Sequence, residues 1–369
     1  MMKNNILSVV ISVLLAGTAN TTEIYNKDNK KLDLYGKVDI LHFFGKKCDS
    51  DESSASLNIR GDTQIFKKVT VFFHSEWKKT NKSETENKKI NYLSYVGLKI
   101  ADFGSLDYGR NYGVLYDINR WTDVLPLYGA DSISQNDSYM TGRNRNLLTY
   151  RNTDFFGIVD DLNFVLQYKG KNTKSNRSDN SDNLKNNGDE LGVAVNYNIG
   201  LGITLGGGYS KSNRGLNKIQ KNKRGSGDNI SEVWNVGIKY DANNLYLAAM
   251  YGETRNITRF GKIINNNNMK QSSNKTENLE LVAQYFFNEI GLKPSIAYIA
   301  SIEKDLIDSF FSQKQDLTKY ISLGAFYYFN KNLNAFIDYK INLINSNNFT
   351  KKYGIDKDNL IGLGLVYQF

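Results

Sequence analysis

Alternation of apolar and polar residues with a period of two runs through most of this chain, and it constrains the fold more than any other feature. Between positions 332 and 343, apolar residues alternate with Asn334, Asp338 and Lys340. Side chains in a β-strand point to opposite faces in turn, so such a segment is typical of a strand with one apolar face. Comparable segments occur at 31–41, 53–65, 69–79, 89–101, 104–110, 145–152, 160–169, 189–198, 200–211, 230–241, 245–252, 277–288, 291–302, 318–329 and 360–369. The sequence predicts an all-β protein of about sixteen strands, each of transmembrane-barrel length.

The connections between these segments differ in length. "DANN" at 241–244 and "NK" at 330–331 are typical of tight turns, whereas 171–187, 212–229, 253–276 and 303–317 are long and polar. Short and long connections alternate through the second half of the chain. A soluble sandwich has no reason for that order, but a membrane barrel has short turns on one side and long loops on the other.

The polar face of the strands carries charges, among them Asp33, Lys37, Asp39 and Asp338. Charges would be costly in a small packed barrel but are tolerated in a water-filled lumen. The alternative is a soluble antiparallel sheet with one solvated face. That alternative fits a few strands equally well, but an open sheet of this size would expose two long edges.

The N-terminal segment predicts export. Lys3 precedes a ten-residue apolar run and a stretch of small residues, as in a secretory signal peptide. We therefore expect a signal peptide at 1–21 and a barrel at 22–369. A mean hydropathy of −0.49 argues against a helical membrane protein. The net charge of +9 is spread along the chain and predicts no nucleic-acid partner. The single cysteine, Cys48, cannot form an intramolecular disulfide.

Several strings, including "EIYNKDNKKLDLYGKVD", "GSLDYGRNYGVLYD" and "LGLVYQF", resemble the enterobacterial general porins of the OmpC/OmpF type, over about residues 22–369. The resemblance implies a sixteen-stranded antiparallel transmembrane β-barrel with a constriction loop folded into its lumen. It implies a homotrimer in the Gram-negative outer membrane, among lipid and lipopolysaccharide, that passes ions and small hydrophilic solutes. It implies no enzyme and no cofactor. Phe369 resembles the signal read by the barrel-assembly machinery.

The resemblance also identifies "WTDVLPLYGAD", at 121–131, as the loop that narrows the pore. It implies that Asp123 and Asp131 supply acidic groups to the constriction. The apolar residues of the loop, above all Trp121, Pro126 and Tyr128, are expected to anchor it to the inner wall.

Transferred position by position, the basic wall of the family corresponds to Lys37, Ser56, Tyr92 and Arg143. Ser56 and Tyr92 stand where the family has arginines, and Leu127 stands where it has a glutamate. Arg145 lies two residues from Arg143 and, like Arg151, shares its period-two phase, which predicts partial compensation. We therefore expect a weaker transverse field than in the relatives and a modest ion preference.

The sequence is also compatible with other functions. His42 and His74 lack the neighbours of a metal site, although His42 keeps an outer-membrane lipase as a remote alternative. "GGG" at 206–208 is interpreted as a thin wall or a subunit contact. A substrate-specific channel, or a host or phage recognition role for the long loops, is also compatible with the sequence.

Overall fold

The computed structural model describes residues 22–45, 50–81, 87–129, 131–133, 139–171, 188–213, 230–261, 263–264, 267–268, 271–306, 311 and 314–369. The predicted signal peptide and Cys48 lie outside these residues. In the described part of the chain, no helix is long and apolar enough to cross a membrane.

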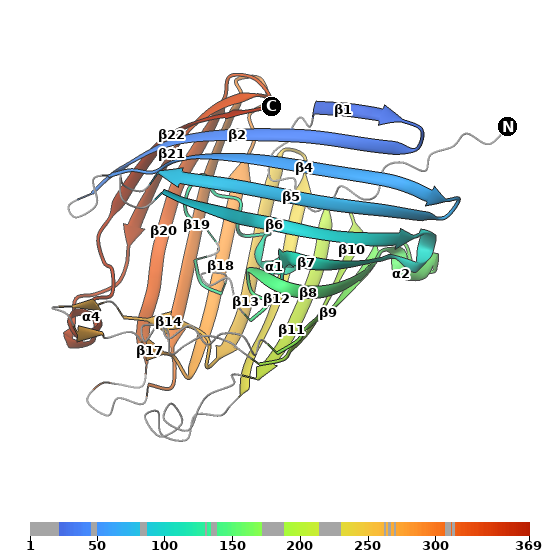
Figure 1. Cartoon of the computed structure of the whole chain (residues 1–369). Coiled ribbons are helices and arrows are strands. Elements are labelled where there is room, and N and C mark those ends of the chain that lie inside the picture. Colours follow the sequence, from blue (N-terminus) through green and yellow to red (C-terminus); the bar gives the residue numbers. More distant parts are fainter. Residues whose placement is uncertain are drawn as a thin grey trace.

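Strands make up most of the described part of the chain (Figure 1). The elements of the first half are β1 (Thr22–Lys27), β2 (Lys30–Phe44), β3 (Ser50–Asp51), β4 (Ser53–Phe66), β5 (Val69–Asn81), β6 (Asn87–Ile100), the 3-10 helix η1 (Ala101–Phe103), β7 (Ser105–Tyr112), α1 (Tyr116–Asn119), β8 (Arg143–Asn152), α2 (Asp154–Gly157), β9 (Leu162–Lys169) and β10 (Glu190–Gly200). Those of the second half are β11 (Ile203–Asn213), β12 (Ile230–Ala242), β13 (Leu245–Arg255), β14 (Arg259–Phe260), β15 (Ile263–Ile264), β16 (Asn267–Asn268), β17 (Gln271–Ser272), β18 (Lys275–Tyr285), β19 (Leu292–Glu303), β20 (Gln315–Tyr328), β21 (Leu333–Asn342), α4 (Asn348–Tyr353) and β22 (Leu360–Gln368).

The long strands form one closed antiparallel barrel of sixteen strands, as the sequence predicts. Each long strand pairs with the next along the chain, and β22 pairs back onto β2 from Lys37↔Gln368 to Phe44↔Ile361. The short strands β1 and β3 extend the sheet at its ends by pairing with β2. Closure leaves no free edge along the barrel wall.

The two ends of the described chain meet at the seam. β1 pairs with the first residues of β2 and β22 with the rest, so β1 continues the line of β22. Between them, Gly36 N donates to Phe369 O and Phe369 N donates to Gly36 O, each at 3.0 Å. A Cβ on Gly36 would lie 2.3 Å from the Phe369 ring, so the glycine leaves room for the terminal aromatic side chain.

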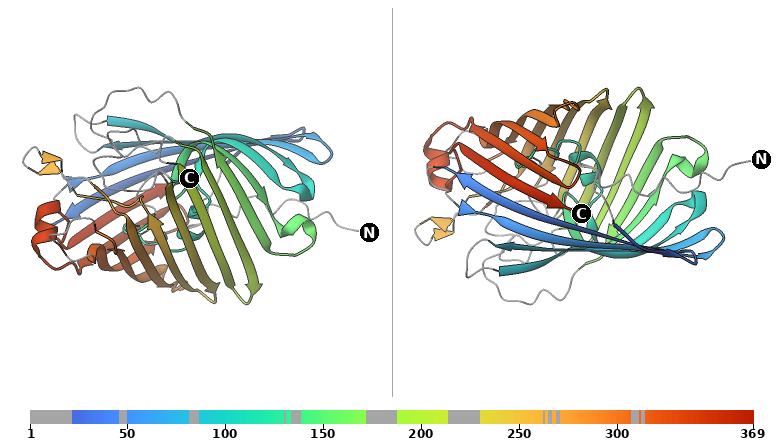
Figure 2. Two further views of the ribbon diagram at one scale, coloured as in Figure 1. Left: turned by 90° about the horizontal axis from the view of Figure 1, so that it is seen from below. Right: turned by 90° about the horizontal axis from the view of Figure 1, so that it is seen from above.

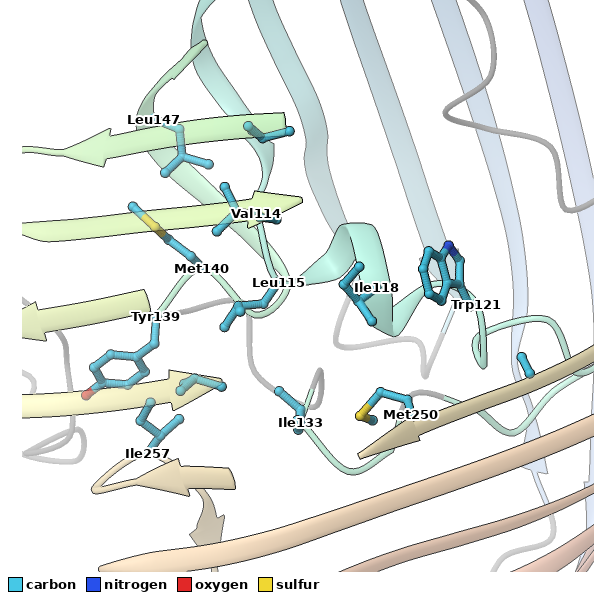
Figure 3. Packing of buried hydrophobic residues seen from close by; sticks show 14 residues of the cluster. Val114, Leu115, Ile118, Trp121, Ile133, Tyr139, Met140, Leu147, Met250 and Ile257 are labelled. Carbon is cyan, nitrogen blue, oxygen red and sulfur yellow. The ribbon is translucent and has the colours of Figure 1, made fainter. Parts of the chain in front are cut away.

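The outer face of the wall is apolar and the packed core lies inside the barrel. Leu205, Val236 and Ile238 are 42–49% exposed on neighbouring strands. The largest buried cluster instead joins the inner wall to the segment between β7 and β8 (Figure 3). The described part of this segment, which contains α1, lies within the ring of strands in both views of Figure 2. The fold therefore places an internal loop inside the lumen of the barrel.

Candidate pore constriction

The described residues between β7 and β8, which are 113–129, 131–133 and 139–142, are called the inner loop. An ion pair binds the first part of the inner loop to the barrel wall. Arg151 of β8 donates two hydrogen bonds to the Asp117 carboxylate, at 2.6 and 3.2 Å, and Asp117 is buried. Gln167 of β9 accepts from Val114 N at 2.8 Å and donates to Tyr112 O at 2.7 Å. The chain thus turns inward through contacts with two neighbouring strands.

Glycines of the wall make room for the apolar side chains of the inner loop. A Cβ on Gly206 would lie 2.5 Å from Ile118 Cδ1 and 2.7 Å from Trp121 Cη2, and one on Gly208 would lie 2.9 Å from Leu115 Cδ2. Glycines on five further strands approach the loop in the same way, namely Gly192, Gly237, Gly252, Gly324 and Gly362. Gly206 and Gly208 of the "GGG" segment therefore form part of the seat of the loop, and a subunit contact at this segment remains a prediction.

The middle of the inner loop is held by a fully buried carboxylate. Glu280 of β18 is 0% exposed and accepts hydrogen bonds from Ser132 N at 3.1 Å and Ser132 Oγ at 2.6 Å. Thr122 Oγ1 donates to the same carboxylate. Trp121 is only 5% exposed, and its carbonyl accepts from the Tyr246 hydroxyl at 2.6 Å. The sequence reasoning missed Glu280, since it lies more than 140 residues from its loop partners.

The tip of the inner loop docks on β20, β21 and β22. Asp338 is 0% exposed and accepts from Leu127 N at 3.1 Å and Tyr128 N at 3.2 Å. The Leu127 side chain lies against β22, where a Cβ on Gly362 would be 2.2 Å from Leu127 Cδ2. Pro126 approaches Gly324 in the same way, with Cδ 3.0 Å from the site of a Cβ. Leu127 thus occupies an apolar seat on the wall.

Both predicted loop acids accept hydrogen bonds from tyrosine hydroxyls. Asp123 accepts from Tyr116 at 2.6 Å, and Asp131 accepts from Tyr320 of β20 at 2.7 Å. Burial raises the pKa of the Asp123 carboxyl above its usual range; the Tyr116 hydrogen bond acts in the opposite direction, and the nearby Asp131 raises the pKa further. Burial also raises the pKa of the Tyr116 hydroxyl, with Asp123 adding to the effect. At neutral pH, Tyr116 is therefore the donor to Asp123.

On the opposite wall, basic side chains lie on neighbouring strands. Lys37 of β2 is opposite Ser56 of β4, and Ser56 is opposite Lys78 of β5. Lys37 Nζ lies 2.8 Å from Asp39 Oδ1. Lys78 interacts electrostatically with Asp39, Lys37 and Arg143. Lys78 is thus a wall cation that the sequence reasoning missed, and it flanks the position at which Ser56 stands for an arginine.

Two cationic side chains lie close to the aromatic ring of Tyr92 in β6. Arg143 Cζ lies 3.4 Å from the ring centroid and Lys78 Nζ 5.7 Å from it. Arg110 Nε donates to the Tyr92 carbonyl at 3.0 Å. A cation near an aromatic face is attracted by the ring quadrupole. Tyr92 therefore lacks the positive charge of an arginine, but its ring brings the Arg143 and Lys78 side chains close together.

Arg145 lies at an irregularity that counting by twos cannot detect. The β7–β8 register runs through Gly109↔Leu147 and then shifts to Asn111↔Asn144. Asn146, next to Arg145, has a positive φ of 61°. Arg145 is exposed at this point. Because of this shift, period-two counting does not extend from Arg143 and Arg145 to Arg151, and a compensating role for Arg145 remains a prediction.

The two histidines have separate environments. His42 Nδ1 lies 2.6 Å from Asp51 Oδ1 in β3. His74 is buried between Asn58 Oδ1 at 3.1 Å and the Tyr95 hydroxyl at 3.2 Å. Over the described ranges, no group of three or more His, Cys, Asp or Glu residues could hold a metal ion.

Comparison with known proteins gives one consistent result. The model of the Gram-negative porin family matches residues 27–369. The chain is 51% identical to outer membrane porin F of Xenorhabdus nematophila and 49% identical to outer membrane protein F of Serratia marcescens, with full coverage of both partners in each comparison. Among solved structures, Salmonella typhi OmpF in complex with daunomycin matches with a TM-score of 0.83 and 40% identity, over 94% of this chain and 100% of that one.

Proposed function

Because this chain belongs to the Gram-negative porin family, we propose a specific arrangement of the charges that filter solutes in its pore. The protein is an outer-membrane porin: its barrel crosses the membrane, and ions and small hydrophilic solutes diffuse passively through it. The inner loop narrows the passage, with Asp123 and Asp131 as its acidic groups. Lys37, Lys78 and Arg143 are the cations that face them.

The observation that carries this proposal is the division of the lumen into two sides. The inner loop packs on glycines of β10 to β13 and on β20 and β22, with Glu280 of β18 and Asp338 of β21 as its buried acceptors. The cations instead come from β2, β5 and the start of β8. The acids lie on the loop, and the cations lie on the part of the wall that the loop does not cover. Together they would create a transverse electric field in a water-filled constriction. Polar solutes would align in this field, and apolar solutes would lose hydration.

We further propose that this transverse field is weaker than the field that three loop acids would create. Leu127 occupies the position of the third acid, and its side chain is seated on Gly362. On the wall, Lys37 is already paired with Asp39 at 2.8 Å. Paired charges of opposite sign cancel within a short distance, so the net ion preference of the pore should be modest.

Reversal potentials across a planar bilayer in a KCl gradient test this arrangement. Asp123→Asn should move the reversal potential toward anion preference, because it removes one negative charge from the constriction. Asp28→Asn is the matched control, since Asp28 lies in the exposed turn between β1 and β2 with a φ of 54° that asparagine also tolerates. An unchanged potential in Asp123→Asn would place this carboxylate outside the ion path.

We propose that residues 1–21 are a signal peptide, that 22–369 form the mature barrel, and that three copies assemble. We propose Phe369 as the group read by the barrel-assembly machinery and lipopolysaccharide as a surface partner. Closure of single-channel current in three equal steps would support the trimer, and single-step closure would contradict it.

The family is one of porins, and we propose that the chain catalyses no reaction. An esterase assay on the detergent-solubilised protein tests the lipase alternative through the His42–Asp51 pair. Saturable, solute-dependent block of the current would favour a substrate-specific channel over a general one. Binding of host or phage material to peptides from the long loops would indicate a recognition role.

A further inference from the structure

A lysine stands on the acidic side of the constriction. Lys340 of β21 is two residues from Asp338, so both side chains belong to the same face of the strand. Lys340 Nζ lies 4.2 Å from the centroid of the Tyr320 ring and 5.4 Å from that of the Tyr128 ring. The two rings meet edge to face at 6.2 Å. The ammonium group is therefore placed between the wall and the loop tip.

The same tyrosine links Lys340 to a loop acid. The Tyr320 hydroxyl donates to Asp131 Oδ2 at 2.7 Å, while the Lys340 ammonium lies over the ring of that tyrosine. One ring and one hydrogen bond separate the ammonium from the carboxylate. That separation is comparable to the Debye length of about 8–10 Å at 0.1–0.15 M salt, so the two charges act together on a passing ion.

Among the described residues near Lys340, the wall carboxylates Glu280 and Asp338 are fully buried and hydrogen-bonded to the inner loop. Asp338 is fully buried and accepts from Leu127 N, Tyr128 N and Ser322 Oγ. The residues opposite Lys340 are Ser322 on β20 and Leu360 on β22. Asp338 is thus engaged in docking the loop, and Asp131 is the loop acid that Lys340 opposes.

We propose that Lys340 is a specificity-determining residue that offsets Asp131, so that Asp123 supplies most of the negative field on the loop side. This inference rests on the proposed constriction and deepens it. The solutes affected are small anions, such as chloride, inorganic phosphate and short carboxylates, which meet a weaker barrier than two unopposed loop acids would present. Lys340 contacts the loop through the Tyr128 ring and the wall through the Tyr320 ring.

The size of the effect follows from Coulomb's law. A unit charge about 7 Å from an ion in a water-like dielectric shifts its energy by roughly one RT, and screening by salt roughly halves that. The shift has opposite sign for cations and anions. Removing the Lys340 charge should therefore raise the cation-to-anion permeability ratio about two- to threefold.

The experiment compares Lys340→Gln, Lys340→Arg and Asp123→Asn with the unaltered porin, as full-length refolded protein in KCl gradients across a planar bilayer. Gel mobility with and without heating first shows that each variant is folded. Lys340→Gln should move the reversal potential toward cations, and Lys340→Arg should leave it where it was. In the double variant Lys340→Gln with Asp131→Asn, the two shifts should largely cancel.

Each outcome decides the proposal. If Lys340→Gln changes current noise or conductance but not the reversal potential, Lys340 only positions the loop and the inference is overturned. If Asp123→Asn shifts the potential while Lys340→Gln does not, this inference fails and the constriction stands. If neither variant shifts it, the constriction itself is misplaced.

Discussion

The seating of Leu127 on Gly362 can be tested by adding one methyl group to the wall. In Gly362→Ala, the new Cβ would lie 2.2 Å from Leu127 Cδ2, whereas it would lie 3.7 Å from Leu41 Cδ1. Non-bonded carbons are most stable at about 3.5–4.0 Å, so the Leu127 side chain must move by more than 1 Å. Overpacking of this kind costs about 1–3 kcal/mol.

That cost acts against the bonds that hold the loop tip. Asp338 accepts from two loop amides, Leu127 N and Tyr128 N, and hydrogen bonds to a charged group contribute about 1.5–3 kcal/mol each. The strain in Gly362→Ala is smaller than this sum, so the loop should stay docked most of the time. Each 1.4 kcal/mol of strain nevertheless raises the undocked fraction about tenfold. The variant should show more frequent excursions of the single-channel current.

The double variant Leu127→Ala with Gly362→Ala should return the current noise toward that of the unaltered porin, because the shorter side chain leaves room for the methyl group. Gly207→Ala is the matched control, since its Cβ would meet only Asn235 O at 3.3 Å and Val236 Cγ1 at 3.4 Å, away from the loop. Single-channel recording over minutes measures the excursions. Additive effects in the double variant would show that the two residues do not touch and would refute the seating.

Three further predictions use the same preparations. The raised pKa of Asp123 means that this carboxyl takes up its proton at a higher pH than an exposed aspartate; acidification from pH 7 toward 5 should therefore shift the reversal potential toward anions. Asp123→Asn should lack that part of the shift, and an identical titration in both proteins would contradict the assignment. Lys78→Gln should shift the potential toward cations about as much as Lys37→Gln, because the two lysines flank Ser56 on adjoining strands; no shift in Lys78→Gln would remove it from the wall. Gly36→Ala should displace the Phe369 ring, which lies 2.3 Å from the site of the new Cβ, and slow the appearance of the heat-resistant folded form on gels; assembly at the unaltered rate would show that the ring can move aside.

The strands could be predicted from the sequence because barrel walls are regular. Each predicted segment has a counterpart among the sixteen strands, and the tight turn at "DANN" is formed by Asn243 and Asn244, which both have positive φ. Asparagine tolerates that conformation better than most residues. A lipid-facing wall requires apolar residues at alternate positions over its whole height, so the pattern is repeated often enough to be recognised.

The wall cations could not be predicted so well, because period-two counting fails at bulges. The β5–β6 register shifts between Glu76↔Leu93 and Trp77↔Asn91, which leaves Tyr92 without a direct partner. Lys78 lies in a predicted strand, but its place beside Lys37 and Ser56 depends on pairing across three strands. Register is set by long-range pairing and turn geometry, which one sequence does not reveal.

The structure separates what holds the inner loop from what gives it charge. Its anchors are buried: Glu280 and Asp338 accept from loop amides and hydroxyls, and wall glycines receive the apolar side chains. The loop acids that are proposed to face the stream accept hydrogen bonds from tyrosine hydroxyls, Asp123 from Tyr116 and Asp131 from Tyr320. A change at Asp123 or Lys340 can therefore alter the field while the shape of the constriction stays in place. Leu127 is the exception, because there the side chain that would have carried charge has become part of the anchor. Its effect on ion preference is consequently inseparable from its effect on docking, whereas Lys340 can be altered with the seat of the loop on Gly362 intact.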